Sequence, residues 1–545
     1  MKENEITNKE YLNFTHGTAY SLLNNYSIFI FQIIISILLS RLLSQELWGI
    51  LILATSIITI VLIVLRMFPP SLDLTVIYYI PKYKIQEQNS ELRSFIKNSV
   101  ILKLFFTIPV FIISIFIFYF LSFFFEISLK SYTDLLLILS PLIIISGLEL
   151  VLNSIYRGFY RFKTIFELTL IKYVFYVSSL IFLILFRESS TVQEIALINL
   201  ITSGLPFLVN CIIFSRLYKG LGPKKEFETP LRRTLSETTK RGTPLSTAIV
   251  INEFWKEVEF QSIGLYESGY VTGFNLSKYF SQISLNIMTS ISAPLFTSLA
   301  NLNAEKNYDQ INKIFNYTFK YSLFLLLLIS GVLFFTAEFF LDFLYGETFL
   351  IYTDVVKLYL ISIIFVVLGN ILVPLLNVKD KVNVMPFLTL SYTLIIAPCF
   401  LIGLIYFGII GGMYGLIISK LIVFIMQIVV CFKIGGVRLN FSKTFIQYGI
   451  FFCSLITSII LETLFFKNFR ILFLNNLNLL VFNKLQFLSL CCFLLIYLIL
   501  TIFFRIYSYK EIEDLENIFS KGTKFHLIIA KVLGKIKKCS KGFRN

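Results

Sequence analysis

The feature that most constrains this chain is residues 244–278, a stretch with the length of a membrane span that is interrupted by ionised residues. Glu253, Lys256, Glu257 and Glu259 all fall within two helical turns. Each ionised side chain at bilayer depth costs roughly 2.5–3.5 kcal/mol, so four on one span cannot face lipid. At 3.6 residues per turn, Glu253, Lys256 and Glu257 share one face. We therefore expect that face to contact protein or water.

Three interpretations of this charged face are open at the level of sequence. The segment is an interfacial or re-entrant helix with its charges among lipid headgroups, or its charges form a structural salt bridge, in which Lys256 pairs with Glu253 or Glu259. The third interpretation is a polar cavity that handles a substrate or a coupling ion. Intramembrane charge favours a functional role by default.

The rest of the chain indicates an all-α polytopic membrane protein. Only 15% of the 545 residues are charged and the mean hydropathy is +0.80, whereas soluble proteins are about 25% charged. The first apolar run is too long for a signal-peptide core, and we expect it to be retained as a span. Apolar runs of about 20 residues predict fourteen spans, near 20–40, 50–70, 99–122, 135–156, 165–186, 195–215, 244–265, 270–298, 317–337, 353–376, 385–407, 412–432, 446–466 and 485–504.

Lysine and arginine predict the orientation of these spans. With a cytoplasmic N-terminus, the cytoplasmic segments hold 34 of these residues and the external loops six, while eight lie within or at the ends of spans. This positive-inside asymmetry places both termini in the cytoplasm and predicts a multi-pass protein of the cytoplasmic membrane. The net charge of +16 is accounted for in this way, and no nucleic-acid recognition module is present.

An internal repeat at an offset near 224 predicts two similar halves. Gly49 corresponds to Gly273, and Pro70 to Pro294, and each proline is followed by a charged connector. Six spans per repeat give both copies the same orientation, with a cavity between them near the midplane. The predicted organisation is an N-terminal six-helix half (1–215), a basic cytoplasmic linker (216–243), a C-terminal six-helix half (244–433), two additional transmembrane helices (434–505) and a basic cytoplasmic tail (506–545).

Several chemistries find no support in the sequence. There is no GxxxxGK[ST] loop for ATP hydrolysis, no HExxH zinc motif, and no cysteine spacing that suggests a metal site. The two histidines lie near the chain ends. We therefore expect no cofactor, no metal and no enzymatic activity, and a transport process driven by a gradient or by the fate of the product.

The intramembrane charges remain as the signal of function. Arg66, Lys103 and Lys420 lie where snorkelling to an interface is the favoured interpretation. Lys256 and Lys278 lie deeper. Cations facing one cavity suit an anionic headgroup, because lysine binds phosphate by charge-assisted hydrogen bonds. The acidic candidates, which either keep the empty cavity near neutral or carry H+ or Na+, are Glu253, Glu257 and Glu149; Asn275 lies one turn before Lys278.

Two stretches carry a resemblance to a known family. SILLSRLLSQELWGILILATS with the PPSLDLTVIYYIPKYK segment that follows, and GYVTGFNLSKYFSQISLNIMTSISAPLFTSLANLNAEKNYDQINKIF with the later LDFLYGETF, resemble polysaccharide-biosynthesis flippases (Wzx-type and related archaeal proteins) of the multidrug/oligosaccharidyl-lipid/polysaccharide (MOP) exporter superfamily. The run GLIYFGIIGGMYGLIIS resembles the family's Gly-rich link between spans eleven and twelve. The resemblance covers roughly residues 15–435, with one departure: PPSLDLT replaces the usual Gly-rich turn after span two.

The resemblance implies a MATE/MOP-like flippase that moves a polyprenyl-phosphate- or diphosphate-linked oligosaccharide to the outer leaflet, for cell-surface polysaccharide or glycoprotein assembly. By position in the family pattern, Lys278 matches a basic site early in span eight, Arg41 matches the arginine closing span one, and Glu253 matches an acidic site in span seven. The predicted substrate-binding residues are thus Lys256, Lys278, Arg41 and Asn275. The expected partners are the lipid-linked oligosaccharide, membrane lipids and glycosyltransferases or a polymerase.

Two other functions are considered beside the flippase. An ion-coupled drug or metabolite antiporter of the same fold would bind cations through Glu253 and Glu257, against which the cavity lysines argue. A membrane glycosyltransferase or polymerase is less consistent with the sequence, because no large external loop and no convincing acid/base pair are present.

Overall fold

A computed structural model describes residues 2–85, 89–124, 127–186, 191–221, 230–304, 306–379, 381–463, 480–504 and 506. These residues are almost entirely helical, and the one β contact among them is an isolated bridge between Met67 and Pro70. Helices satisfy every backbone hydrogen bond within one segment, which hydrocarbon requires of a chain that crosses it. The predicted all-α fold is therefore confirmed.

The described residues form two compact units, one within 1–276 and 381–419 and the other within 277–380 and 420–545. The first unit contains α1 (Lys2–Leu42), α2 (Gln45–Leu65), α3 (Leu72–Ile85), α4 (Asn89–Phe124), α5 (Ile127–Leu139), α6 (Leu142–Gly158), α7 (Phe162–Phe186), α8 (Val192–Lys219), α9 (Leu231–Tyr266), the start of α10 (Ser268–Ala304), η2 (Val382–Val384) and the first part of α14 (Met385–Lys433). The second contains the rest of α10 and α14 together with α11 (Tyr308–Tyr345), η1 (Glu347–Tyr352), α12 (Thr353–Ile363), α13 (Val367–Val378), α15 (Phe441–Leu461) and α17 (Leu480–Phe503).

Ten helical segments of the described chain are long and apolar enough to cross a membrane. α14 covers two of the predicted spans, α17 contributes a shorter apolar helix at Phe487–Phe503, and the more polar α9 and α10 are not among the ten. The protein is thus a multi-pass membrane protein, while the number fourteen and the two six-helix repeats remain predictions. The predicted tail 506–545 lies outside the described residues except for Ile506.

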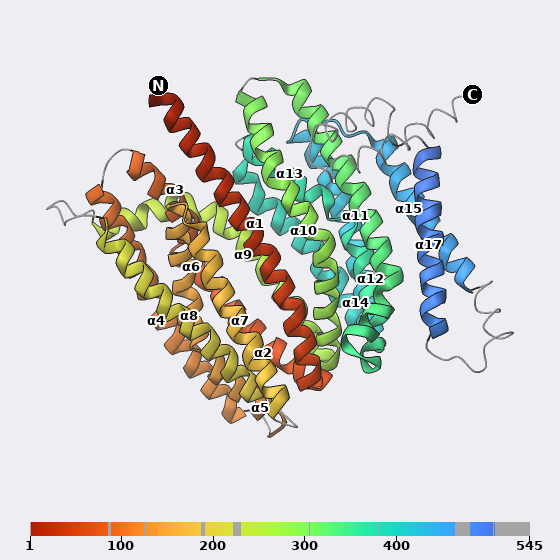
Figure 1. The fold of residues 1–545 in the computed structure, drawn as a ribbon, viewed down its shortest axis with the longest axis horizontal. Helices are drawn as coiled ribbons and strands as arrows, with labels where there is room; N and C mark the ends of the chain where they lie inside the picture. Colours follow the sequence, from red (N-terminus) through yellow and green to blue (C-terminus); the bar gives the residue numbers. More distant parts are fainter. Residues whose placement is uncertain are drawn as a thin grey trace. The chain divides into compact units, whose positions relative to one another are not determined.

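One hydrophobic cluster of the first unit lies where α3, α4, α6, α7 and α8 meet (Figure 1). Ile80 of α3 contacts Gly158 of α6 so closely that a Cβ at Gly158 would lie 2.9 Å from the Ile80 side chain. Tyr156 is fully buried beside them, and its hydroxyl donates to Asn210 Oδ1 at 2.7 Å. Burial of this polar group is tolerated because the hydrogen bond replaces the lost water.

The helical hairpin in α14 confirms the predicted Gly-rich link. The two arms meet at Gly408, which has φ +65° and interrupts the helix. A Cβ at Gly403 would lie 2.2 Å from the Gly411 carbonyl oxygen, and one at Gly415 would lie 2.2 Å from the Cys399 oxygen. Only glycine allows backbones to approach this closely, so these glycines set the spacing of the two arms.

In the second unit, α17 contacts α11 and α15 (Figure 1). The ring of Phe493 fits over Gly331 of α11, where a Cβ would lie 2.0 Å from the ring Cζ atom. Tyr497 stacks on Phe493 with ring centroids 5.7 Å apart. The last predicted helix, α17, is therefore attached to α11 by aromatic packing.

We predict that Gly403→Ala lowers the melting temperature of the purified protein, because the new methyl group would collide with the Gly411 carbonyl. Overpacking of this kind costs typically about 1–3 kcal/mol. Gly449→Ala is the matched control, since a Cβ at Gly449 has nothing within 4 Å. Thermal unfolding in detergent, followed by size-exclusion chromatography, measures both. Equal melting temperatures for the two variants would contradict the hairpin geometry.

Candidate functional site

The charged segment predicted from sequence lies on α9, a 36-residue helix. At 1.5 Å per residue α9 is roughly 54 Å long, longer than a hydrocarbon core of about 30 Å. It begins after Pro230, inside the predicted linker, and ends at Tyr266 because Glu267 is extended (φ −163°, ψ 123°). One continuous helix therefore joins the end of the linker to the charged face.

Helix α2 runs antiparallel along α9. Gln261 donates to the Leu53 carbonyl oxygen at 3.0 Å, and Ser56 donates to the Glu257 carbonyl oxygen at 3.4 Å. A Cβ at Gly264 would lie 2.4 Å from the Leu53 side chain. The pairing of these positions places the C-terminal end of α2 beside the first half of α9.

Three further close contacts fix the ends of this pairing. A Cβ at Gly49 would lie 2.0 Å from the Ser268 carbonyl oxygen, and Thr272 donates to the Gln45 carbonyl oxygen at 2.8 Å. At the opposite end, a Cβ at Gly242 would lie 1.9 Å from the Pro70 carbonyl oxygen. Glycine is needed at these contacts because the backbones approach with no room for a side chain.

The pairing of α2 with α9 forms an ion pair between Arg66 and Glu253. The Arg66 guanidinium donates to a Glu253 carboxylate oxygen, and the two side chains are 27% and 36% exposed. Arg66 thus has a carboxylate partner within its own unit, while its position relative to a membrane interface stays a prediction. Lys256, Glu257 and Glu259 make further interactions of their own.

Lys103 of α4 lies at the same end of α2. Its amino group donates to the Leu65 carbonyl oxygen at 2.9 Å, and the residue is only 2% exposed. The last carbonyls of a helix have no intrahelical partner and form the negative end of its dipole, which favours a cation there. The Asp73 carboxylate acts electrostatically on the same amino group. The prediction that Lys103 snorkels is therefore wrong, because its amino group is buried against the end of α2.

The segment that joins α2 to α3 begins with Arg66. It has a cis peptide bond between Phe68 and Pro69, and the Ser71 N–H donates to the Arg66 carbonyl oxygen at 3.0 Å. This is the PPSLDLT stretch in which the sequence departs from the family pattern. We name Arg66, Lys103, Asp73 and Glu253 the α2 charge cluster; it contains two cations and two carboxylates.

In the second unit, Lys420 also contacts residues of a neighbouring helix. Its amino group donates to Ser362 Oγ at 2.9 Å and lies 4.7 Å from the centroid of the Tyr359 ring. An aromatic face attracts a cation through its quadrupole. Lys420 therefore has partners within its own unit.

The remaining predicted site residues lie on four helices. On α9, Lys256 is exposed, whereas Glu253 and Glu257 are partly buried. Arg41 is exposed in the last turn of α1, and Glu149 is partly buried on α6. Asn275 and Lys278 are partly buried on α10, with Lys278 in the second unit.

The structure thus brings Glu253 together with Arg66, a residue that sequence reasoning had set aside. The one available signal was the position of Arg66 and Lys103 at the facing ends of two consecutive spans. The substrate roles of the predicted residues remain predictions. Within the described ranges, no three His, Cys, Asp or Glu side chains gather closely enough to hold a metal ion.

Comparison with solved structures shows the fold that this chain shares. The lipid II flippase MurJ in an inward closed conformation matches with a TM-score of 0.62 and 16% identity, covering 89% of this chain and 98% of MurJ. An inward-facing multidrug resistance MATE transporter of the MOP superfamily matches with a TM-score of 0.60 and 13% identity, covering 75% of this chain and 93% of the transporter. A mutant of the Vibrio cholerae MATE transporter VcmN matches with a TM-score of 0.54 and 14% identity, covering 77% of this chain and 96% of VcmN.

Sequence comparison gives the family. No curated protein sequence matches the chain significantly. The family described as polysaccharide biosynthesis protein matches residues 14–300, more than half of the chain, and this range contains α2 and the charged face of α9. The protein shares the fold of MATE transporters and MurJ, and it belongs to the polysaccharide biosynthesis protein family.

Proposed function

We propose that the protein moves a polyprenyl-phosphate- or diphosphate-linked oligosaccharide from the cytoplasmic to the outer leaflet of the cytoplasmic membrane. The observation that carries this proposal is membership of the polysaccharide biosynthesis family. The likeness to MurJ, described as a lipid II flippase, supports it at the level of fold. Family membership speaks against a glycosyltransferase or polymerase.

The physical requirement explains why the charged face matters. An unshielded phosphate in hydrocarbon faces a desolvation cost on the order of tens of kcal/mol. A polar passage lined by cations replaces the lost water with charge-assisted hydrogen bonds. In the proposed alternating-access cycle, Lys256, Lys278, Arg41 and Asn275 bind the headgroup while the lipid tail stays in the bilayer.

The acidic residues have a different proposed role. Glu253, Glu257 and Glu149 keep the empty passage near neutral, and H+ or Na+ coupling would act through them. The Arg66–Glu253 pair supports this role, since its two charges already compensate each other. An entering phosphate competes with Glu253 for the Arg66 guanidinium, so we add Arg66 to the residues proposed to bind substrate.

A cation antiporter of the same fold is the second candidate, favoured by the likeness to MATE transporters. Such a transporter needs a carboxylate that is available to its cargo. Glu253 is engaged by a guanidinium, which makes it a poor ligand for a second cation. This contact favours the flippase over the antiporter.

The first test is transfer by the purified protein in proteoliposomes that contain a fluorescent polyprenyl-diphosphate-linked disaccharide. We expect Lys256→Ala with Lys278→Ala to slow transfer roughly tenfold or more, because each lost charge-assisted hydrogen bond is about 1.5–3 kcal/mol. Lys163→Ala is the control, since its side chain is 65% exposed on α7. Full transfer by the double variant would remove the site assignment, and cation efflux without glycan transfer would establish the antiporter.

The second test concerns the ion pair. We expect Arg66→Glu to lower the melting temperature by placing two carboxylates together, and the swapped pair Arg66→Glu with Glu253→Arg to restore it in part. Because both side chains are partly exposed, a double-mutant cycle should give a coupling energy of about 0.2–1 kcal/mol. A coupling energy of zero would show that the contact does not stabilise the protein.

A further inference from the structure

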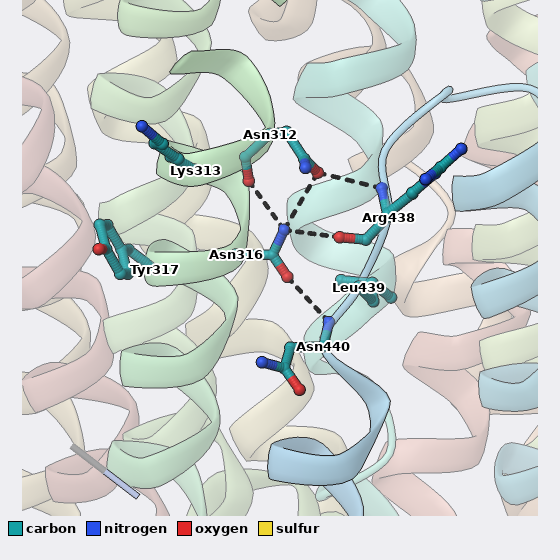
Figure 2. Close-up of a pocket in the computed structure, with 7 residues that line it drawn as sticks. All are labelled: Asn312, Lys313, Asn316, Tyr317, Arg438, Leu439 and Asn440. Atoms are coloured by element: carbon teal, nitrogen blue, oxygen red, sulfur yellow. Dashed lines mark hydrogen bonds between the residues drawn. The ribbon is translucent and has the colours of Figure 1, made fainter. Parts of the chain in front are cut away.

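A second polar region, independent of the α9 site, lies in the second unit at the start of α11 and α15. A pocket of about 490 Å³ opens between α11 and the segment 434–440 that precedes α15. Figure 2 shows the residues that line it, which are Asn312, Lys313, Asn316, Tyr317, Arg438, Leu439 and Asn440. A smaller adjoining pocket of about 80 Å³ is lined in part by Lys320, Lys443 and Gln447.

Two asparagines build the pocket wall (Figure 2). The Asn316 amide donates to the Arg438 carbonyl oxygen at 2.8 Å, and the Asn440 N–H donates to Asn316 Oδ1 at 3.1 Å. The Arg438 N–H donates to Asn312 Oδ1 at 3.0 Å. We name these contacts the asparagine clasp. Because the clasp uses only the backbone of residue 438, the Arg438 side chain remains available to a ligand, whereas the Asn440 side chain caps α15 by accepting from the Lys443 N–H at 3.4 Å.

The other end of the segment is also fixed. The Lys379 amino group donates to the Gly435 carbonyl oxygen, and Gly436 has φ +59°. A Cβ at Gly436 would lie 3.2 Å from the Lys379 amino nitrogen. The segment 434–440 is thus held from both sides, and the pocket is preformed.

The pocket region is cationic. Lys313 and Arg438 lie on opposite sides of the clasp (Figure 2). Lys443, and Lys320 at 8% exposure, line the adjoining pocket. The residues that line the two pockets include no carboxylate. Four positive charges within two adjoining pockets favour a ligand that carries phosphate.

The position along the helices indicates that this ligand is a lipid. The candidate span in α15 is Ser442–Leu461. Its 20 residues are roughly 30 Å long, which matches the hydrocarbon core. Lys443 therefore lies at the depth of the headgroups. Tyr317, 45% exposed, lines both pockets and provides apolar surface next to the cations.

We propose that this pocket binds the headgroup phosphate of an anionic phospholipid, whose acyl chains lie along Tyr317 and the apolar surface of α15. Basic pockets between transmembrane helices on the cytoplasmic side bind acidic headgroups in this way. The predicted orientation of the chain puts 434–440 on that side. A bound lipid would join α11 to α15 and so help to hold the C-terminal helices in place.

The test compares lipid binding by native mass spectrometry of the full-length protein, titrated with phosphatidylglycerol or phosphatidylcholine. The variant carries Lys313→Gln, Arg438→Gln and Lys443→Gln, which leaves every backbone contact of the clasp in place. We expect its affinity for phosphatidylglycerol to fall roughly tenfold or more and its weak binding of phosphatidylcholine to stay unchanged. The conservative variant Lys313→Arg, Arg438→Lys, Lys443→Arg should retain binding.

The matched control removes three exposed charges from the first unit by Lys82→Gln, Arg157→Gln and Lys163→Gln. An equal loss of phosphatidylglycerol binding in this control would overturn the proposal, because net charge alone would then explain it. Two further competition measurements distinguish an anionic phospholipid from other ligands that carry phosphate. Displacement of the lipid by millimolar inorganic phosphate, or preferential binding of polyprenyl diphosphate, would also overturn the assignment to an anionic phospholipid. Neither measurement depends on the transfer activity of the protein.

Discussion

The cost of an ionised side chain in hydrocarbon governs how the first unit is built. Helix α9 carries Glu253, Lys256, Glu257 and Glu259 within two turns, and such a helix needs a neighbour that compensates charge. Helix α2 is that neighbour, although it is almost wholly apolar. It brings one cation, Arg66, to Glu253, while Lys103 neutralises the negative end of the same helix.

Close backbone contact makes this compensation possible. Glycines at 49, 242 and 264 let α2 approach α9 and its neighbouring segments without side chains between them. The glycine contacts fix the register of the two helices, and this register decides which polar groups meet. The same device closes the α14 hairpin at Gly403 and Gly411. In the pairing of α2 with α9, glycine therefore decides which charged groups meet, because it allows the backbone contacts that fix the register of the helices.

Basic residues have different proposed roles in the two units. In the α2 charge cluster, the cations are balanced by carboxylates, as suits a passage that stays neutral until an anion enters. Around the asparagine clasp, Lys313, Arg438 and Lys443 lie in pockets without carboxylates, as suits a site occupied by a resident anion. The contrast separates a proposed transport route from a proposed structural lipid site.

The sequence by itself determined the all-helical membrane fold, the charged face of α9 and the Gly-rich hairpin, because hydropathy, charge and glycine spacing are local properties of the chain. It also placed the protein in its family. It did not determine that Arg66, Lys103 and Lys420 have partners within their units, since those partners lie tens to hundreds of positions away. Only the tertiary structure decided these pairs, because helix register and burial arise from packing between distant segments.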